Sequence, residues 1–282
     1  MADIHISVII PTCHRNDLLT KCLDCLAPGA QTLPADLYEV IVTDDGSKST
    51  AEAMVHEQYP WARWVAGPKK GSASNRNNGS NTATGGWLAF IDDDCIPCSN
   101  WLAAYSSAVI SGTYVFEGKT TCNEGIYSPM MEAPLNLKGG LFNSCNVMVN
   151  SKIFFELEGF DENFPYPAME DWDFHDRLQK ASYHIEFVND AVVNHPPRRR
   201  YWGGQYAKLL ESHVYMWCKQ KQKRPFYVVA AMMLIIRLRV IARYPFSKDF
   251  VIAILSLLVE ALYLVLHIGG WERKYRRYFS LS

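Results

Sequence analysis

The feature that most constrains this chain is an apolar run that ends in three consecutive carboxylates. Residues 87–91 are WLAFI, and Asp92, Asp93 and Asp94 follow directly. A short run rich in aromatic and branched residues is typical of a buried strand, and three acids at its end repel one another unless a positive charge offsets them. Mg²⁺ and Mn²⁺ bind carboxylate oxygens and keep positions open for phosphate oxygens. The run therefore predicts a metal–diphosphate site, and the alternative is a solvated acidic turn that caps the next helix.

The first half of the chain alternates between strand patterns and helix patterns. Short apolar runs at 4–10, 38–42 and 62–66 precede the run at 87–91, with polar or helical segments between them. This alternation is the signature of a parallel sheet flanked by helices, whose ligands bind beyond the carboxyl ends of the strands. No GxGxxG follows the first strand, which argues against a dinucleotide-binding domain. The DDGS turn at 44–47 fits a ligand site or an ordinary capping turn.

Charge divides the chain into two unlike parts. The formal net charge is −1, yet the residues through His195 include 12 Lys and Arg against 25 Asp and Glu, and those from Pro196 include 16 against 4. The second part therefore faces an anionic partner. Its two apolar runs, at 226–236 and 250–268, favour a lipid surface over nucleic acid.

The longer apolar run is almost long enough to cross a bilayer. It has 19 residues with one acid, Glu260, and at about 1.5 Å per residue it nearly matches the hydrocarbon layer. Basic residues beside the loop at 244–249 and after residue 268 disfavour a transmembrane hairpin. We therefore expect helices that lie in the cytoplasmic interface. Soluble helices that pack on the first part or on a second subunit remain the alternative.

Cysteine usage and the amino terminus bear on the compartment. Neither CLDC at 22–25 nor CIPC at 95–98 has a matching His or second pair at zinc-finger spacing, so we expect free thiols in a reducing compartment. The apolar run near the start is short and has no basic lead, so we expect no signal peptide.

The order of these motifs resembles the nucleotide-sugar domain of family 2 glycosyltransferases, which have the GT-A fold. The resemblance runs from residue 4 to about 200. The matching pieces are Pro11-Thr12, Asp44-Asp45-Gly46-Ser47, Gly71 with Arg76-Asn77 and Gly79, Asp92-Asp93-Asp94, Gly159-Phe160-Asp161-Glu162, and Glu170-Asp171-Trp172-Asp173 with Arg177. Each is weak singly, but six in the family's order argue against chance. Cys13-His14-Arg15 and Ser74-Asn75 depart from the family's pattern and leave the donor open.

The resemblance implies a domain organisation and a donor site. It implies a GT-A α/β domain over 1–200, with a mostly parallel sheet, a nucleotide-binding half at 1–97 and an acceptor-side half at 98–200, followed by a membrane-associating helical tail at 201–282. The donor-binding residues it implies are Pro11, Thr12, Asp44, Asp45, Arg76, Asp92 and Asp93. It implies a Mn²⁺ or Mg²⁺ ion on Asp94 and Asp92. His195 ends a strand-like run, where a lone His is usually structural, but some relatives place a metal-binding His in this region.

The acids at 170–171 open a predicted helix. They lie between two large apolar side chains, which favours a partly dry pocket where burial raises a carboxylate's pKa. Acids also favour a first helical turn for its dipole alone. By resemblance, Asp171 is the general base, and Glu170 and Trp172 lie on the acceptor side.

These features predict an inverting glycosyltransferase. It would move a sugar from a nucleotide-diphosphate donor, with UDP expected, to a hydroxyl of a glycan or lipid-linked acceptor. We expect it on the cytoplasmic face of the inner membrane, peripheral or monotopic, with no nucleic acid partner and with homo-oligomers through the tail as an option. The alternatives are a membrane-bound nucleotidyltransferase that makes an activated sugar or lipid head group, although its Gly-rich, Lys-containing loop is missing, and a non-catalytic scaffold, which intact Asp94 and Asp171 argue against.

Overall fold

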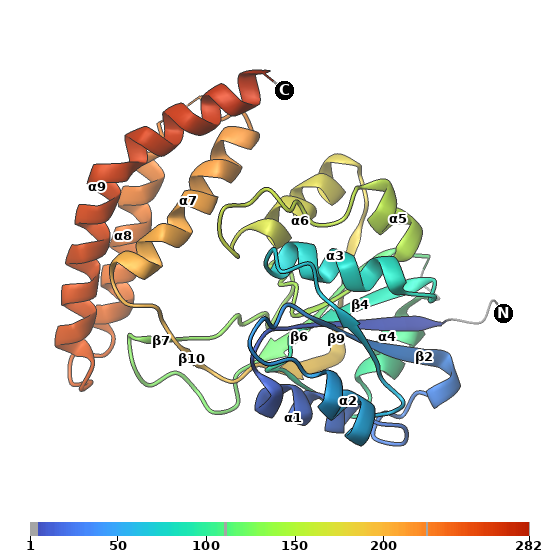
Figure 1. Ribbon diagram of the computed structural model, residues 1–282. Helices are drawn as coiled ribbons and strands as arrows, with labels where there is room; N and C mark the ends of the chain where they lie inside the picture. The colour runs from blue at the N-terminus through green and yellow to red at the C-terminus, as the bar shows by residue number, and fades with distance from the viewer. Residues whose placement is uncertain (1–4, 110–111, 224, 282) are drawn as a thin grey trace. The chain divides into compact units, whose positions relative to one another are not determined.

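The computed structural model describes residues 5–109, 112–223 and 225–281, which form two compact units (Figure 1). Residue 4 of the first predicted strand lies outside the described residues. Unit 1 runs to Asn123 and adds Pro134–Glu162 and Glu170–Pro196, whereas unit 2 comprises Glu124–Ala133, Asn163–Met169 and the residues from Pro197 onward. Two short segments from the middle of the chain thus group with the tail, which the sequence analysis did not anticipate.

Unit 1 is built on one mixed sheet with helices on both faces. In the described residues the sheet has eight strands, in the order β3-β2-β1-β4-β8-β6-β9-β5. The strands are β1 (Ile6–Thr12), β2 (Tyr38–Asp44), β3 (Arg63–Ala66), β4 (Trp87–Ile91), β5 (Ile96–Pro97), β6 (Val115–Thr121), β8 (Asn146–Asn150) and β9 (Ile185–Asn194). The helices are α1 (Asn16–Leu26), η1 (Ala35–Leu37), α2 (Glu52–Gln58), α3 (Ser72–Thr82), α4 (Trp101–Ala108), α5 (Ser151–Glu156) and α6 (Glu170–Lys180).

Strand pairing brings the polar motifs of the first half to one edge of the sheet. β1 pairs parallel with β2 and with β4, and Thr12 lies opposite Asp44. The carboxyl ends of these strands therefore meet, as predicted for an open α/β sheet. In the second half, β8 pairs antiparallel with β4 and β6. The predicted α/β fold with a mostly parallel sheet is confirmed, with these antiparallel pairings as its departure.

Successive side chains along a strand point to opposite faces of the sheet, and each face packs into its own core. Val8 and Ile10 belong to the core beneath α1, α2 and α4, whereas Ile9 belongs to the opposite core with Phe90 and Phe174, as the period of two in a strand requires. Figure 1 shows α3, α5 and α6 on this second face. The ring of Phe160 packs against the rings of Phe90 and Phe174, with centroids 5.2 and 5.3 Å apart. Because such pairs stabilise by about 0.5–1.5 kcal/mol each beyond burial, they fix α6 on the sheet.

Unit 2 consists mainly of three helices, α7 (Gly204–Lys219), α8 (Tyr227–Ala242) and α9 (Phe250–Leu281), with a short ladder between β7 (Met131–Glu132) and β10 (Arg198–Arg199). Among the described residues, one helix, Phe250–Ser280, is long and apolar enough to cross a membrane by length and composition. Only 22% of its most apolar 18-residue window is buried. A core helix of a water-soluble protein would be mostly buried, and α9 is not.

Three polar side chains of α8 and α9, those of Arg237, Ser256 and Glu260, are buried in the helix pair. Glu260 of α9 is 1% exposed and accepts hydrogen bonds from Arg237 Nη2 at 3.1 Å and from Ser256 Oγ at 2.8 Å. The exposed apolar side chains of the two helices are Val228, Met232, Ile235, Ile236, Leu238, Val251, Ile252, Leu255, Leu258, Leu262, Val265 and Leu266. This arrangement inverts the usual polarity of surface helices in water.

Candidate active site

The three acids after β4 have different partners. Asp92 Oδ1 lies 2.6 Å from Arg76 Nη2. Asp93 is fully buried and accepts hydrogen bonds from Thr12 Oγ1 at 2.7 Å and Arg15 Nε at 3.1 Å. Asp94 Oδ2 accepts from Arg15 Nη1 at 3.0 Å. The polar residues at the ends of β1 and β4 are therefore joined into one network.

Two arginines offset part of the negative charge that the sequence analysis assigned to a metal ion. Burial raises the pKa of Asp93 to about 7, although the guanidinium of Arg15 and the hydroxyl of Thr12 act in the opposite direction. Burial also acts on Asp92, but the ion pair with Arg76 outweighs it and lowers that pKa. Repulsion among the three acids therefore does not by itself require a metal. The contact of Arg15 with Asp93 and Asp94 could not be read from the sequence, in which Arg15 is only a departure from the family pattern.

The strongest structural support for a metal is an oxygen without a hydrogen bond. Asp94 Oδ1 is buried, accepts none from any described residue, and lies 3.4 Å from His195 Nε2. His195 Nδ1 lies 2.8 Å from Pro196 O, and because a carbonyl only accepts, Nδ1 carries a proton, which leaves Nε2 as the ring nitrogen that can bind a metal ion. A carboxylate with an imidazole nitrogen suits Mn²⁺ better than Mg²⁺. The residues fit a divalent cation held by Asp94 and His195.

Two further side chains near this site contribute less to the fit. Cys95 Sγ lies within 4.8 Å of the ligand atoms of Asp94 and His195, but burial raises the pKa of this thiol well above its usual value, so it stays protonated. Asp92, expected as a second metal ligand, is paired with Arg76 and lies outside this group.

The two acids of the DDGS turn have different surroundings. Asp44 is buried, and its oxygens accept hydrogen bonds from the backbone N–H groups of Gly46 at 2.7 Å and Ala51 at 2.6 Å. Asp45 is half-buried and accepts from Lys69 N and Gly71 N at 2.9 and 3.0 Å. Asp44 therefore shapes the turn, and of the two predicted donor residues Asp45 is the one that reaches the surface.

Polar side chains of α3 lock neighbouring motifs together. Asn75 Nδ2 donates to Thr43 O at 2.9 Å. Ser74 Oγ and Asn77 Nδ2 donate to the carboxylate of Glu162 at 2.7 and 2.9 Å. The Ser74-Asn75 departure therefore has a structural use, and the motif at 159–162 is held against α3.

Arg76 joins the two halves of the site. Arg76 is 4% exposed, and its guanidinium pairs with Asp92 at 2.6 Å and with Glu170 Oε1 at 3.3 Å. Glu170 also accepts from Ser72 Oγ at 2.8 Å. The charge of Arg76 is thus compensated by one acid after β4 and one acid of α6, and Glu170 is a structural partner of α3.

Asp171 differs from the other acids of α6, because Glu170, Asp173 and Asp176 each form an ion pair with a described residue and Asp171 does not. It is half-buried, its Oδ1 accepts from Trp172 N at 2.8 Å, and its Oδ2 faces Ser144 N at 3.4 Å. Burial and the adjacent charge of Glu170 raise its pKa to about 7, against the opposing effect of Arg76. A carboxylate with such a pKa can take up a proton near neutral pH. The side chain of Trp172 is 41% exposed beside it.

A loop before β8 supports Asp171, and sequence reasoning missed its anchor. Glu117 of β6 is buried and accepts hydrogen bonds from Phe142 N at 2.9 Å and Leu141 N at 3.3 Å, and also from Gly140 N. Gly139, Gly140 and Phe142 have positive φ of 82°, 88° and 43°. The carboxylate thus holds a backbone that most residues avoid, two residues before the Ser144 N–H that faces Asp171.

Comparisons with known proteins find two family models and several relatives that this chain resembles. The family described as glycosyl transferase family 2 matches residues 7–114, and the family described as glycosyltransferase like family 2 matches residues 117–197. Glycosyltransferase AglE of Haloferax volcanii is 29% identical over 208 residues, which cover 68% of this chain and 67% of that protein. Validoxylamine A glucosyltransferase of Streptomyces hygroscopicus subsp. limoneus is 38% identical over 91 residues, covering 31% of this chain and 20% of that protein.

Two solved structures have the same fold. Residues 1–349 of S. aureus TarS superpose with a TM-score of 0.58 at 18% identity, covering 77% of this chain and 64% of that one. The mannosyltransferase PcManGT from Pyrobaculum calidifontis, in complex with GDP-Man and Mn²⁺, superposes with a TM-score of 0.58 at 18% identity, covering 97% and 84%. At this identity the likeness concerns the fold alone.

Proposed function

The chain belongs to the family 2 glycosyltransferases and has the GT-A fold, and on this premise we propose that it is an inverting, metal-dependent enzyme acting at a membrane. The donor is a nucleotide-diphosphate sugar, with UDP the first nucleotide to test. The acceptor is a hydroxyl of a glycan or lipid-linked glycan. The observation that carries the proposal is that unit 1 contains two carboxylates suited to different roles. Asp94 has an oxygen without a hydrogen bond beside His195, and Asp171 has a pKa of about 7.

Asp171 acts as the general base. Its carboxylate takes the proton of the acceptor hydroxyl while that oxygen attacks the anomeric carbon and the bond to the diphosphate breaks. One base opposite the leaving group gives a single displacement, which inverts the anomeric centre. Backbone N–H groups of Trp172 and Ser144 hold the two oxygens of Asp171 at 2.8 and 3.4 Å, so the base is oriented before substrate binds.

The acids after β4 would hold a divalent cation that binds the donor diphosphate. A Mn²⁺ or Mg²⁺ ion on Asp94 and His195 would neutralise charge that develops on the departing nucleoside diphosphate. Arg15 orients Asp94 from the other side, because its Nη1 lies 3.0 Å from Asp94 Oδ2. Thr12, Asp45, Arg76 and Asp92 belong to the donor side, as the resemblance implies.

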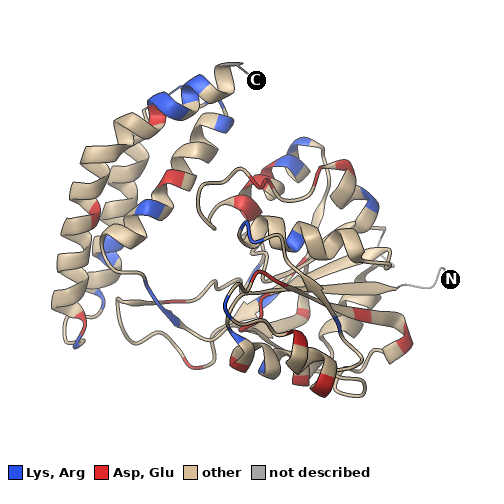
Figure 2. Ribbon diagram, viewed as in Figure 1, with Lys and Arg blue, Asp and Glu red and all other residues tan. Residues whose placement is uncertain are grey.

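The inverted polarity of α8 and α9 supports a place in the membrane interface. Apolar side chains are exposed along α9 from Val251 to Leu266, a stripe of about 23 Å at 1.5 Å per residue, shorter than the roughly 30 Å hydrocarbon layer. The ribbon of α9 in Figure 2 is free of basic residues along this stretch and carries several near its C-terminal end, where Arg273, Arg276 and Arg277 lie. Arg239, Arg243 and Lys248 lie near the other end. Basic residues at both ends favour monotopic binding to the anionic cytoplasmic leaflet.

Release of nucleoside diphosphate from a panel of nucleotide sugars with Mn²⁺ tests the proposed reaction. The purified full chain in detergent should release nucleoside diphosphate from one donor. In the Asp171→Asn variant, addition of acceptor should not accelerate this release. Release of diphosphate from a nucleoside triphosphate would instead favour nucleotidyl transfer. No turnover of any nucleotide sugar, with the fold intact, would contradict the proposed enzyme.

A further inference from the structure

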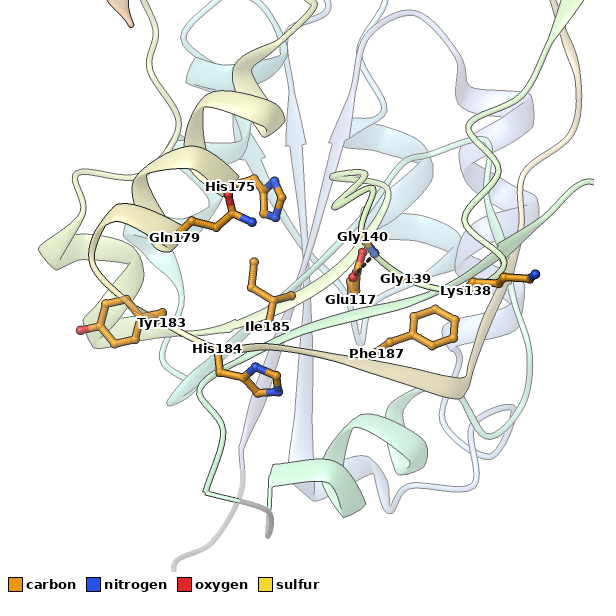
Figure 3. A pocket seen from close by; sticks show the side chains of 10 residues that line it. All are labelled: Glu117, Lys138, Gly139, Gly140, His175, Gln179, Tyr183, His184, Ile185 and Phe187. Carbon is orange, nitrogen blue, oxygen red and sulfur yellow. Dashed lines mark hydrogen bonds between the residues drawn. The ribbon is translucent and has the colours of Figure 1, made fainter.

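Unit 1 contains a pocket that the proposed reaction does not use. It has a volume of about 410 Å³ and lies between α6, the loop at Lys138–Gly140 and the start of β9 (Figure 3). This volume falls within the roughly 300–1,000 Å³ of small-molecule sites. His175, Gln179, His184 and Phe187 are among the side chains that line it.

The pocket continues the face of α6 that carries Asp171. Asp171, His175 and Gln179 are spaced four residues apart, so they share one side of the helix. From Asp171 to Gln179 the helix rises about 12 Å, which several linked sugar rings can span and one ring cannot. The ring of Trp172 meets that of His175 edge-on at 5.9 Å, so aromatic surface connects the base with the pocket.

The lining combines groups that recognise hydroxyls with apolar surface. His175 stacks on Phe142 at 5.4 Å with an interplanar angle of 12°, and burial lowers its pKa, so near neutral pH the imidazole both donates and accepts. The amide of Gln179 does the same. Phe187 and Ile185 supply apolar surface for C–H faces. The carboxylate of Glu117 already accepts hydrogen bonds from backbone N–H groups of the 140–142 loop, so its charge does not disfavour binding of a neutral ligand.

We propose that this pocket is a subsite for a sugar unit of the acceptor glycan that lies several units from the reacting hydroxyl. The inference rests on the proposed function and extends it, because it makes the substrate an existing oligosaccharide. The pocket then selects for acceptor length. The enzyme elongates a chain and acts poorly on a single sugar.

The first test compares acceptors of increasing length. Full-chain enzyme in a non-glycosidic detergent is assayed with mono-, di- and trisaccharides, and the ratio of kcat/KM for trisaccharide to that for monosaccharide is measured. We expect a ratio of at least about ten in the wild type and a ratio near one in Gln179→Ala/His184→Ala. Both side chains are exposed, so the fold should survive, which the melting temperature checks. Lys180→Ala, the next residue on α6 and exposed, should keep the wild-type ratio. A wild-type ratio near one overturns the subsite.

The second test does not depend on turnover. Binding of the same oligosaccharides to the full-chain Asp171→Asn variant is followed by saturation-transfer NMR without donor. Affinity should fall at least about tenfold when Gln179→Ala/His184→Ala is added and stay unchanged with Lys180→Ala. Equal affinity in all variants, or no saturable binding, overturns the subsite. Binding at the pocket without turnover of any nucleotide sugar would instead contradict the proposed reaction and leave a glycan-binding site.

Discussion

At Asp171, burial and the charge of Glu170 raise the pKa, while Arg76 and two backbone N–H groups lower it, with a result of about 7. Because the base must be deprotonated, kcat/KM should fall tenfold per pH unit below about 7. Glu170→Gln removes a charge that raises the pKa, so the acidic limb should move to lower pH. Initial rates across pH measure the position of this limb, and an unmoved limb in Glu170→Gln would exclude Asp171 as the titrating group.

Asp171→Asn should lower the initial rate of sugar transfer by about 10² or more, while its donor affinity stays within a few-fold of the wild type.

Asp94 offers a separate prediction, on metal binding. Asp94→Asn replaces a ligand oxygen with an amide beside His195, so Mn²⁺ affinity and turnover should both collapse. Mn²⁺ binding is measured by electron paramagnetic resonance in the presence of nucleoside diphosphate, which does not require turnover. Asp176→Asn, at a half-buried carboxylate that pairs with the exposed Lys180, serves as the matched control. Full activity of the wild type in EDTA would refute the metal assignment.

At the scale of the element, the loop at 139–142 depends on one buried carboxylate. In Glu117→Gln the amide cannot accept from three backbone N–H groups, and each buried donor left without a partner costs about 1–3 kcal/mol. We expect a lower melting temperature, faster hydrogen exchange at 139–144, and a larger loss in kcat than in donor affinity, because Ser144 N no longer holds Asp171. Glu156→Gln, at an exposed carboxylate of α5, should leave all three unchanged. Unchanged exchange in the loop would show that other contacts hold it.

The strands of the first half could be predicted because their apolar runs and the polar turns after them are local patterns. Contacts that depend on register could not. Arg15 meets Asp93 and Asp94 from 78 and 79 residues away, and only the parallel pairing of β1 with β4 brings them together. The difference between Asp44 and Asp45 follows from which side of the strand each faces at its end, which the DDGS turn does not reveal. The run at 146–150 has no local feature that distinguishes an antiparallel strand from a parallel one.

At the scale of the whole molecule, the exposed apolar face of unit 2 predicts how the chain partitions. The full chain should sediment with membranes and resist extraction by high salt, because apolar burial is not screened. Leu258→Glu/Leu262→Glu changes two side chains that are 61% and 62% exposed, so it should leave packing intact and move protein to the supernatant. Phe155→Glu, at a 47% exposed site of unit 1, is the control. If the wild type is soluble without detergent and this face is protected between copies of the chain, then the tail is an oligomerisation element.

With the membrane binding proposed above, the ion pair between Arg237 and Glu260 constrains how the chain would reach that membrane during biogenesis. On translocon scales a lone charge at the centre of a helix costs about 2.5–3.5 kcal/mol to insert, and Arg237 in α8 and Glu260 in α9 are charges of this kind, buried only because they pair with each other. Inserted one after the other as they leave the ribosome, both helices would pay that penalty, whereas a hairpin already closed on its ion pair buries both charges. Delivery to the bilayer is therefore expected after synthesis, as an assembled hairpin, and the interval before it is when the chain is most prone to aggregate.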